Sequence, residues 1–126
     1  MNLLYAPWRQ NYLRTETNKN RNTANQTCVF CDQPEQNQDE HNYILKRFKY
    51  NYVLLNLYPY NAGHLLIIPF EHKSKLYNFN QEIQQEHIKI VSLVSEILEK
   101  TFNCDGINIG LNMGKASGGT VPEHMH

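Results

Sequence analysis

Two histidines near the end of the chain, His124 and His126, are the side chains best suited to chemistry on a phosphate group. They flank Met125, and in a strand both would point to one face because side chains alternate with a period of two. An imidazole on that face can attack phosphorus or carry a proton. A fortuitous surface pair, or the remnant of a tag, is the alternative interpretation of the same residues.

A glycine-rich stretch stands just before this pair, in the sequence NMGKASGGTV at 112–121. Gly114, Gly118 and Gly119 have no Cβ, so their backbone N–H groups can approach a bound group closely, and Thr120 adds a hydroxyl. Such donors stabilise the oxygens of a phosphate. A simple turn is the alternative, and these residues alone do not decide between the two.

Cys28 and Cys31 form a C-x-x-C pair, the spacing at which two thiolates can hold one metal ion. A reducible pair, or two buried thiols, would have the same spacing. The chain holds three cysteines in all, which does not resemble the disulfide framework of a secreted protein. The pair therefore indicates metal or redox chemistry.

Length and composition narrow the class of protein. The 126 residues suit a single domain, 1–126, with a real core. Twelve basic residues balance twelve acidic ones, which argues against a general binder of nucleic-acid polymers. No apolar run approaches the length of a membrane span, and the start lacks the apolar region of a signal peptide. We therefore expect a cytoplasmic protein that does not interact with membranes.

Residue patterns predict the elements that position these side chains. Short runs rich in Val, Ile, Leu and Tyr predict strands, and apolar residues at helical spacing predict one long helix with a core-facing stripe. We expect strands at 43–47, 50–57, 64–69 and 106–111, a helix at 80–102 capped by Asn80, and polar loops at 16–27 and 32–42. His87 lies in the helix stripe, where we expect a packing residue. The apolar segment 1–15 is expected to pack on the domain or on a partner subunit.

Together, the motifs resemble those of the histidine triad superfamily of nucleotide hydrolases and transferases. They follow the expected order over nearly the whole chain: YAPWR at 5–9, CVFC at 28–31, LYPYNAGH at 57–64, P-x-x-H at 69–72 and NIGLNMG at 108–114. With VPEH at 121–124, they are most similar to the bacterial and mycobacterial branch that resembles diadenosine tetraphosphate phosphorylases. The resemblance implies an α+β fold, with the 80–102 helix packed on a central antiparallel sheet, and a homodimer.

The resemblance also implies roles for individual residues. The middle histidine of the family motif His-x-His-x-His is the nucleophile, and that position falls on His126, with His124 in first place. Asn56 and Leu57 match positions that contact the nucleoside, and His64 matches a position that supports the site. A third histidine would fall two residues beyond His126, so we expect a chain of this length to keep much of the fold but little nucleotidyl transfer.

Around the phosphate, Asn112 matches an amide that holds an oxygen near the nucleophile, and Gly118, Gly119 and Thr120 match the surrounding loop. The implied reaction is hydrolysis or transfer of a nucleotidyl group from a nucleoside 5′-phosphoryl compound, through a nucleotidyl-histidine. Diadenosine polyphosphates are the leading class of substrate. A nucleotide-binding module without turnover and a zinc-stabilised interaction domain remain as alternatives.

A structural zinc is the cofactor that the resemblance implies, and no organic cofactor is expected. Its ligands would be Cys28, Cys31, His72 and His124, as in zinc-containing members of the superfamily. Two thiolates and two imidazoles complete a tetrahedral set and leave no position for a catalytic water.

Overall fold

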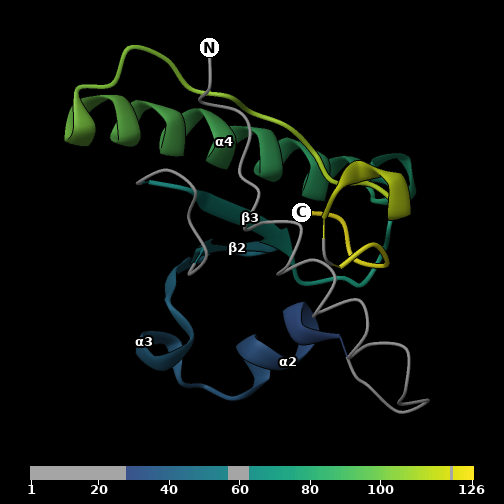
Figure 1. Ribbon diagram of the computed structural model, residues 1–126. Helices are drawn as coiled ribbons and strands as arrows, with labels where there is room; N and C mark the ends of the chain where they lie inside the picture. Colours follow the sequence, from purple (N-terminus) through teal and green to yellow (C-terminus); the bar gives the residue numbers. More distant parts are fainter. Residues whose placement is uncertain (1–27, 57–62, 120) are drawn as a thin grey trace.

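The computed structural model of the chain shows a sheet with one long helix lying across it (Figure 1). The structure describes residues 28–56, 63–119 and 121–126. The predictions that lie outside these ranges are those for segment 1–15, loop 16–27, Leu57 and Thr120. The arrangement of the described residues is the α+β fold that the sequence predicted.

The described residues form a three-stranded antiparallel sheet in the order β1-β2-β3. Its strands are β1 (Ile44–Arg47), β2 (Asn51–Leu55) and β3 (Leu65–Pro69). Each strand begins and ends within two residues of a predicted one. The central strand β2 is the most deeply buried of the three, because it pairs on both edges and also meets the helix.

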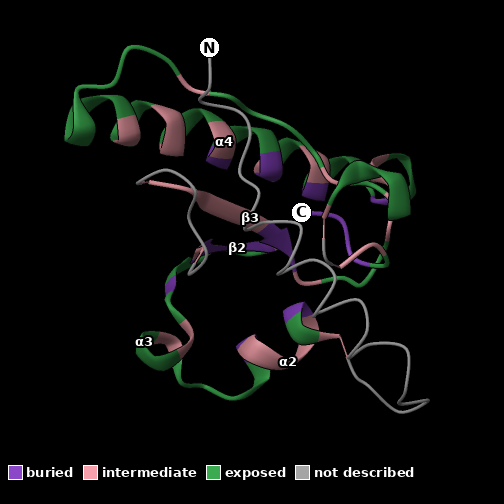
Figure 2. Cartoon of the chain, in the orientation of Figure 1, coloured by how far each residue is buried: buried purple, intermediate pink, exposed green. Residues whose placement is uncertain are grey.

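The long helix α4 (Gln81–Phe102) is the one that the apolar periodicity predicted. Asn80 caps it, since its Oδ1 accepts a hydrogen bond from the Ile83 amide at 3.0 Å. Its fully buried residues, Ile83, His87 and Ile90, all lie in its first half, whereas the second half shows only half-buried and exposed positions (Figure 2). No helix within the described ranges combines the length and apolar character that crossing a membrane requires.

A buried polar network joins α4 to the central strand. Glu86 Oε1 accepts hydrogen bonds from the backbone amides of Tyr50 and Asn51, at 2.9 and 3.0 Å, and from Asn51 Nδ2 at 3.1 Å. The side-chain oxygen of Asn51, Oδ1, accepts a hydrogen bond from His87 Nδ1 at 2.8 Å. Burial lowers the pKa of His87, so the ring stays neutral and hydrogen-bonded in the core. His87 is therefore a packing residue, as predicted.

The prediction of a polar loop at 32–42 is wrong in part, because two short helices occupy this region: α2 (Val29–Glu35) and α3 (Asp39–Asn42). Buried Phe30 and Pro34 anchor α2 to the core, which a reading of the polar residues alone overlooks. Cys28 is the N-cap of α2 and Cys31 lies in its first turn, so helix formation here positions the two thiols.

An ion pair holds α3 against β1. The Arg47 guanidinium donates to both carboxylate oxygens of Asp39, at 3.0 and 2.7 Å. A second Arg47 bond runs from Nη2 to the carbonyl of Pro34 at 2.6 Å. Asp39 is thus bonded to the sheet rather than simply solvated, so a polar residue within 32–42 helps to hold the local structure together.

The segment 106–111 forms no strand, contrary to the prediction. A strand needs a neighbour for its backbone groups, and this segment makes no ladder with any strand of the described sheet. The next residue, Asn112, does form a backbone hydrogen bond: its amide donates to the carbonyl of His126 at 2.9 Å. Apolar composition alone therefore misled the assignment.

The end of the chain, 121–126, is also outside any strand, yet its side chains alternate as predicted. The rings of His124 and His126 both contact Phe30, at centroid distances of 5.7 and 4.9 Å. Met125 lies between them and packs instead into a separate core cluster. Its amide donates to the carbonyl of Lys73 at 2.8 Å, which ties this end to the loop after β3.

Candidate functional site

Four potential metal ligands converge next to α2: Cys28, Cys31, His72 and His124. Cys28 caps α2 and Cys31 lies in its first turn, because the Cys28 carbonyl accepts the Cys31 amide at 3.0 Å. His72 belongs to the loop after β3, and His124 comes from the end of the chain. Three separate segments thus meet at one point.

The distances between these ligand atoms suit a single tetrahedral ion. The two Nδ1 atoms of His72 and His124 lie 3.3 Å apart. The sulfur-to-nitrogen distances are 3.4 Å for Cys28–His124, 3.4 Å for Cys31–His72 and 3.5 Å for Cys31–His124. A tetrahedral ion with the usual bond lengths places two such nitrogens about 3.3 Å apart and a sulfur and a nitrogen about 3.6 Å apart. Four of the six pairs of ligand atoms therefore have close to the spacing of a four-coordinate metal site, and all the ligand atoms lie within 4.8 Å of one another.

A second hydrogen bond prepares His124 as a ligand. Its Nε2 lies 2.7 Å from the carbonyl oxygen of Pro69, which can only accept, so Nε2 carries the proton. Nδ1 is then left with a lone pair directed at the cluster, the outer-shell arrangement typical of metal-bound histidine. Burial lowers the pKa of His124 to about 4, partly offset by the bond to Pro69, so the ring is neutral at pH 7.

The Cys31 thiol needs a nearby cation to ionise at pH 7. Burial, together with the neighbouring Cys28, raises the pKa of Cys31 to about 11, so Cys31 alone stays protonated at pH 7. A bound dication reverses this preference, because it stabilises the thiolate directly. This chemistry favours metal binding over a free pair of reactive thiolates.

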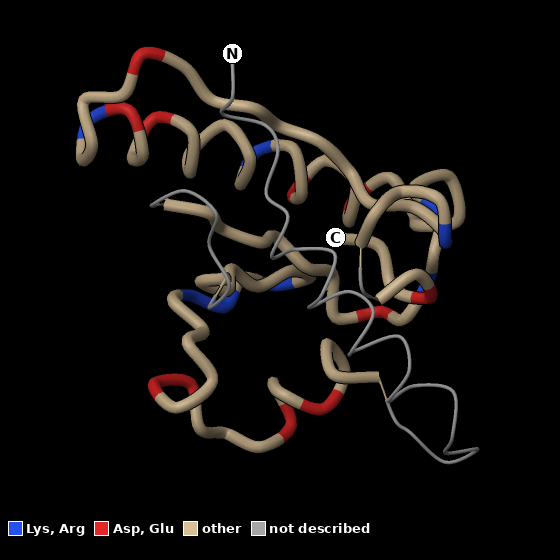
Figure 3. Tube along the Cα trace, in the orientation of Figure 1, with Lys and Arg blue, Asp and Glu red and all other residues tan. Residues whose placement is uncertain are grey.

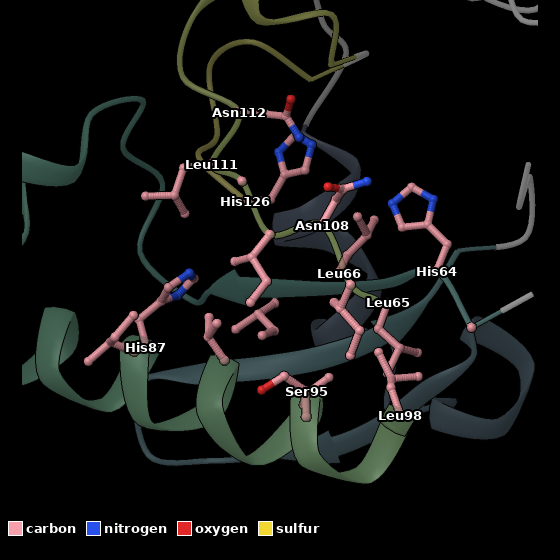
Figure 4. A pocket seen from close by; sticks show the side chains of 18 of the residues that line it. His64, Leu65, Leu66, His87, Ser95, Leu98, Asn108, Leu111, Asn112 and His126 are labelled. Carbon is pink, nitrogen blue, oxygen red and sulfur yellow. The ribbon is translucent and has the colours of Figure 1, made fainter. Parts of the chain in front are cut away.

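A cleft of about 1020 Å³ opens between α4, β3 and segment 106–112. Apolar side chains of α4 and β3 cover one side of it. His64, Asn108, Asn112 and His126 lie on the side away from α4 (Figure 4). The cleft thus combines a large apolar wall with a group of polar side chains.

His126 is held so that one ring nitrogen is available for chemistry. It is only 9% exposed, and it lines the cleft. Its Nδ1 lies 2.9 Å from the His124 carbonyl, which can only accept, so Nδ1 donates and Nε2 keeps a lone pair. Burial lowers the pKa of His126, with a further contribution from His64, so the ring is neutral at pH 7. A neutral imidazole with its tautomer fixed is the form that acts as a nucleophile.

The glycine loop touches this imidazole. A Cβ on Gly119 would lie 3.2 Å from His126 Cε1 and 3.2 Å from Asn112 Cβ, so only glycine lets the loop backbone approach so closely. Asn112 is fixed in turn by its amide bond to the carbonyl of His126. The structure therefore brings three of the predicted phosphate-site residues together, and it leaves Gly118 exposed at the tip of the loop.

Asn56 and His64, which also have predicted roles in the site, come from the region around the end of β2 and the start of β3. Asn56 follows β2, and its Nδ2 donates to His64 Nδ1 at 3.2 Å. His64 lines the cleft and Asn56 does not, so Asn56 positions His64 in this conformation. Sequence reasoning gave no role to Asn108, whose side chain lies between His64 and His126 in Figure 4. Its place in the NIGLNMG motif was the available signal.

Comparison with known proteins decides the family. The sequence matches the HIT domain family over residues 37–126. This protein belongs to the HIT domain family. Among curated HIT relatives, the AP-4-A phosphorylase of Mycobacterium tuberculosis (strain ATCC 25618 / H37Rv) is 33% identical over 125 residues, which cover 98% of this chain and 64% of that protein.

A second curated relative, the bis(5′-adenosyl)-triphosphatase of Saccharomyces cerevisiae (strain ATCC 204508 / S288c), is 30% identical over 84 residues. The match covers 66% of this HIT chain and 40% of the yeast protein. The chain thus spans less than two thirds of the length of either relative.

Solved structures show the same fold. A HIT family protein from Bacillus anthracis str. 'Ames Ancestor' matches with a TM-score of 0.69 and 25% identity, over 79% of this chain and 70% of that chain. A Zn-bound histidine triad family protein from Mycobacterium smegmatis matches with a TM-score of 0.67 and 24% identity, over 79% and 70% respectively. The described part of this HIT protein therefore has the architecture of its family.

Proposed function

We propose that this protein is a nucleotidyl hydrolase or transferase that acts on diadenosine polyphosphates, with His126 as the nucleophile. The observation that carries the proposal is the setting of His126: Nδ1 bonded to the His124 carbonyl, Nε2 left with its lone pair, and the ring against the glycine loop at a large cleft. The names of the two curated relatives, AP-4-A phosphorylase and bis(5′-adenosyl)-triphosphatase, support the class of substrate.

The reaction has two displacements at the α-phosphorus. In the first, His126 Nε2 forms a bond to phosphorus, and the bond to the bridging oxygen breaks with its electron pair leaving on the polyphosphate. In the second, an oxygen of water or inorganic phosphate attacks, and the electron pair of the N–P bond returns to Nε2. Water releases AMP, and inorganic phosphate releases ADP.

The surrounding groups stabilise the charge that develops on phosphorus. Backbone donors of the loop at Gly118 and Gly119, with the Asn112 amide and the Thr120 hydroxyl, are assigned to the equatorial oxygens. The His124 carbonyl stabilises the positive charge that His126 gains when Nε2 bonds to phosphorus, since Nδ1–H donates to it. Asn56 and Leu57 are assigned to the nucleoside and His64 to support of the site, as the sequence predicts.

We also propose that the four-ligand cluster of Cys28, Cys31, His72 and His124 holds a structural zinc. Its closed tetrahedral set leaves no site for a reacting water, so the metal shapes the fold and takes no part in the reaction. Elemental analysis of protein purified without chelators should find about one zinc per chain. A value well below that would contradict the zinc site.

Covalent capture tests the reaction. The intact protein and a His126→Asn variant are incubated with diadenosine tetraphosphate labelled at the α-phosphorus, with and without inorganic phosphate, and quenched. Acid-labile label on the wild-type chain alone supports the proposal, and the nucleotide released tells water from phosphate. Binding without transfer would instead indicate a nucleotide-binding module, and absence of both would indicate a zinc-stabilised interaction domain. A homodimer stays a prediction that sedimentation of the same protein tests.

A further inference from the structure

A lysine from outside the glycine loop covers the end of the loop opposite His126. Gly114 has a positive φ of 79°, and a Cβ built on it would lie 3.1 Å from Lys75 Nζ. The ammonium group therefore lies close against Gly114, where a larger residue would crowd it. Gly119, at the far end of the same loop, approaches His126 instead.

Hydrogen bonds close the loop between these two glycines into one turn. The Ser117 hydroxyl donates to the Gly114 carbonyl at 2.8 Å and accepts from the Gly119 amide at 3.4 Å. The short helix η2 (Lys115–Ser117) lies within it. The loop is therefore one closed turn, with His126 against Gly119 and Lys75 against Gly114.

Lys75 is held in place by its own backbone. Its carbonyl accepts the Asn78 amide at 3.1 Å, and it caps the short helix η1 (Leu76–Asn78). The next residue, Leu76, donates its amide to Met113 Sδ at 3.4 Å, beside Gly114. The lysine segment and the glycine loop are thus bonded to each other at the point where Nζ meets Gly114.

The charge of Lys75 has no carboxylate partner among the described residues. Its neighbour Lys73 differs, because Lys73 pairs with Glu71 at 2.9 Å and lies over the ring of Phe79. The segment 106–119 carries one lysine, Lys115, and no acidic residue (Figure 3). Lys75, a half-buried residue, therefore adds positive charge to a loop that has no acidic residue.

We propose that Lys75 binds the phosphates of the substrate that lie beyond the one attacked by His126, and so favours dinucleoside polyphosphates over substrates with a single phosphate. The inference rests on the proposed function, because it assigns the direction in which the polyphosphate leaves His126. An ammonium at the Gly114 end of the loop attracts a polyanion that extends to it, and it gains little from a ligand whose charge is confined to the other end of the loop.

Steady-state kinetics with two substrates tests this assignment. Diadenosine tetraphosphate presents a polyphosphate, and adenosine 5′-phosphoramidate presents one phosphorus. A Lys75→Met variant should raise the KM for the tetraphosphate about tenfold and change the KM for the phosphoramidate less than about twofold. Lys75→Arg, which keeps the positive charge, should have a KM for the tetraphosphate close to that of wild type. The matched control is Lys89→Met on the exposed face of α4, which should alter neither value.

A binding measurement keeps this inference separate from the reaction. Inorganic tripolyphosphate is titrated into the wild-type protein, Lys75→Met and Lys89→Met at low salt. Weaker binding in Lys75→Met alone upholds the site even if no protein turns over nucleotide, in which case only the proposed function fails. Equal tripolyphosphate binding by all three proteins, or an equal KM change for both substrates in Lys75→Met, would overturn the role of Lys75.

Discussion

The segment 124–126 contributes to two sites that differ in construction, the four-ligand cluster and the cleft. His124 completes the cluster, where four ligand atoms from three segments lie within 4.8 Å of one another. His126, two residues later, lines a cleft of about 1020 Å³ whose third wall, 106–112, is joined to no strand of the described sheet. The cluster is closed and fully provided with ligands, whereas the cleft is wide and open.

Under the proposed function, this difference separates stability from chemistry. The cluster joins α2, the loop after β3 and the end of the chain, so a metal there fixes the backbone on which His126 sits. His126 lines the cleft, and among the described residues its ring has a hydrogen bond at Nδ1 and none at Nε2. A rigid anchor beside an open site is the arrangement that a preorganised nucleophile needs.

Removing the metal should therefore have the largest effect on stability. Cys31→Ser, or treatment with a strong chelator, should lower the free energy of unfolding by about 4 kcal/mol, because metal binding energy is also folding energy. Thermal unfolding and metal analysis measure the change. Hydrogen exchange should rise most at 28–35 and 70–75, the segments that the cluster joins, and much less in α4.

Cys104→Ser is the matched control for that experiment. Cys104 is exposed and lies outside the cluster, so the same substitution should leave both metal content and stability almost unchanged. If Cys31→Ser behaves like Cys104→Ser and still retains one metal per chain, the cluster is not the anchor, and the contrast between the two regions fails.

An intermediate effect is expected where α4, one wall of the cleft, is attached to the sheet. Asn51→Ala removes the group that bonds both Glu86 and His87, and it leaves the His87 donor unsatisfied in the core. The expected loss is about 2–3 kcal/mol in the free energy of unfolding. Gln85→Ala, at an exposed position of the same helix, should cost less than about 0.5 kcal/mol.

The same network has a pH signature. Burial lowers the pKa of His87 in the folded protein below the value of about 6.5 that it has when unfolded. Its contribution to stability is therefore complete above pH 6.5 and is lost as the pH falls through the folded value. Chemical denaturation at several pH values between 5 and 8 measures the free energy of unfolding. This free energy should fall less steeply with decreasing pH in His87→Leu than in wild type. Parallel slopes would contradict this assignment.

Local patterns predicted the regular elements well. The helix at 80–102 follows from apolar residues at helical spacing and a capping Asn80. Both signals are local, because each depends only on residues a few positions apart in the sequence. The three strands follow from short apolar runs between turn residues. The C-x-x-C spacing likewise marked half of the metal cluster, but only resemblance to a family joined it to His72 and His124, which lie far away in sequence.

Features that depend on a neighbour were harder to predict. The run at 106–111 has the composition of a strand, but composition does not show whether a partner edge is available, and the described sheet offers it no ladder. The helices in 32–42 depend on buried Phe30 and Pro34 and on the Asp39–Arg47 pair. Lys75 approaches Gly114 only because two distant segments pack together, so its sequence neighbours carried no signal.

The smallest expected effect belongs to that Asp39–Arg47 pair, which ties α3 to β1. Its hydrogen bonds to Arg47 hold the pKa of Asp39 below its usual value. Both side chains are still about a third or more exposed, so solvent screening limits the interaction. Asp39→Asn should cost less than about 1 kcal/mol at pH 7, and less again in high salt.

The sign of the pH dependence gives this last prediction a second test. Because the folded pKa of Asp39 is lowered, the pair stabilises the protein above the unfolded pKa of about 3.9, and the stabilisation is lost as the pH falls through the folded value. The stability difference between wild type and Asp39→Asn should thus stay constant from pH 7 to pH 5 and disappear only in strong acid. A double-mutant cycle with Arg47→Met isolates the pair from the metal ligands, which are common to all four proteins. A coupling energy that exceeds about 2 kcal/mol would show that α3 belongs to the rigid anchor rather than to its periphery.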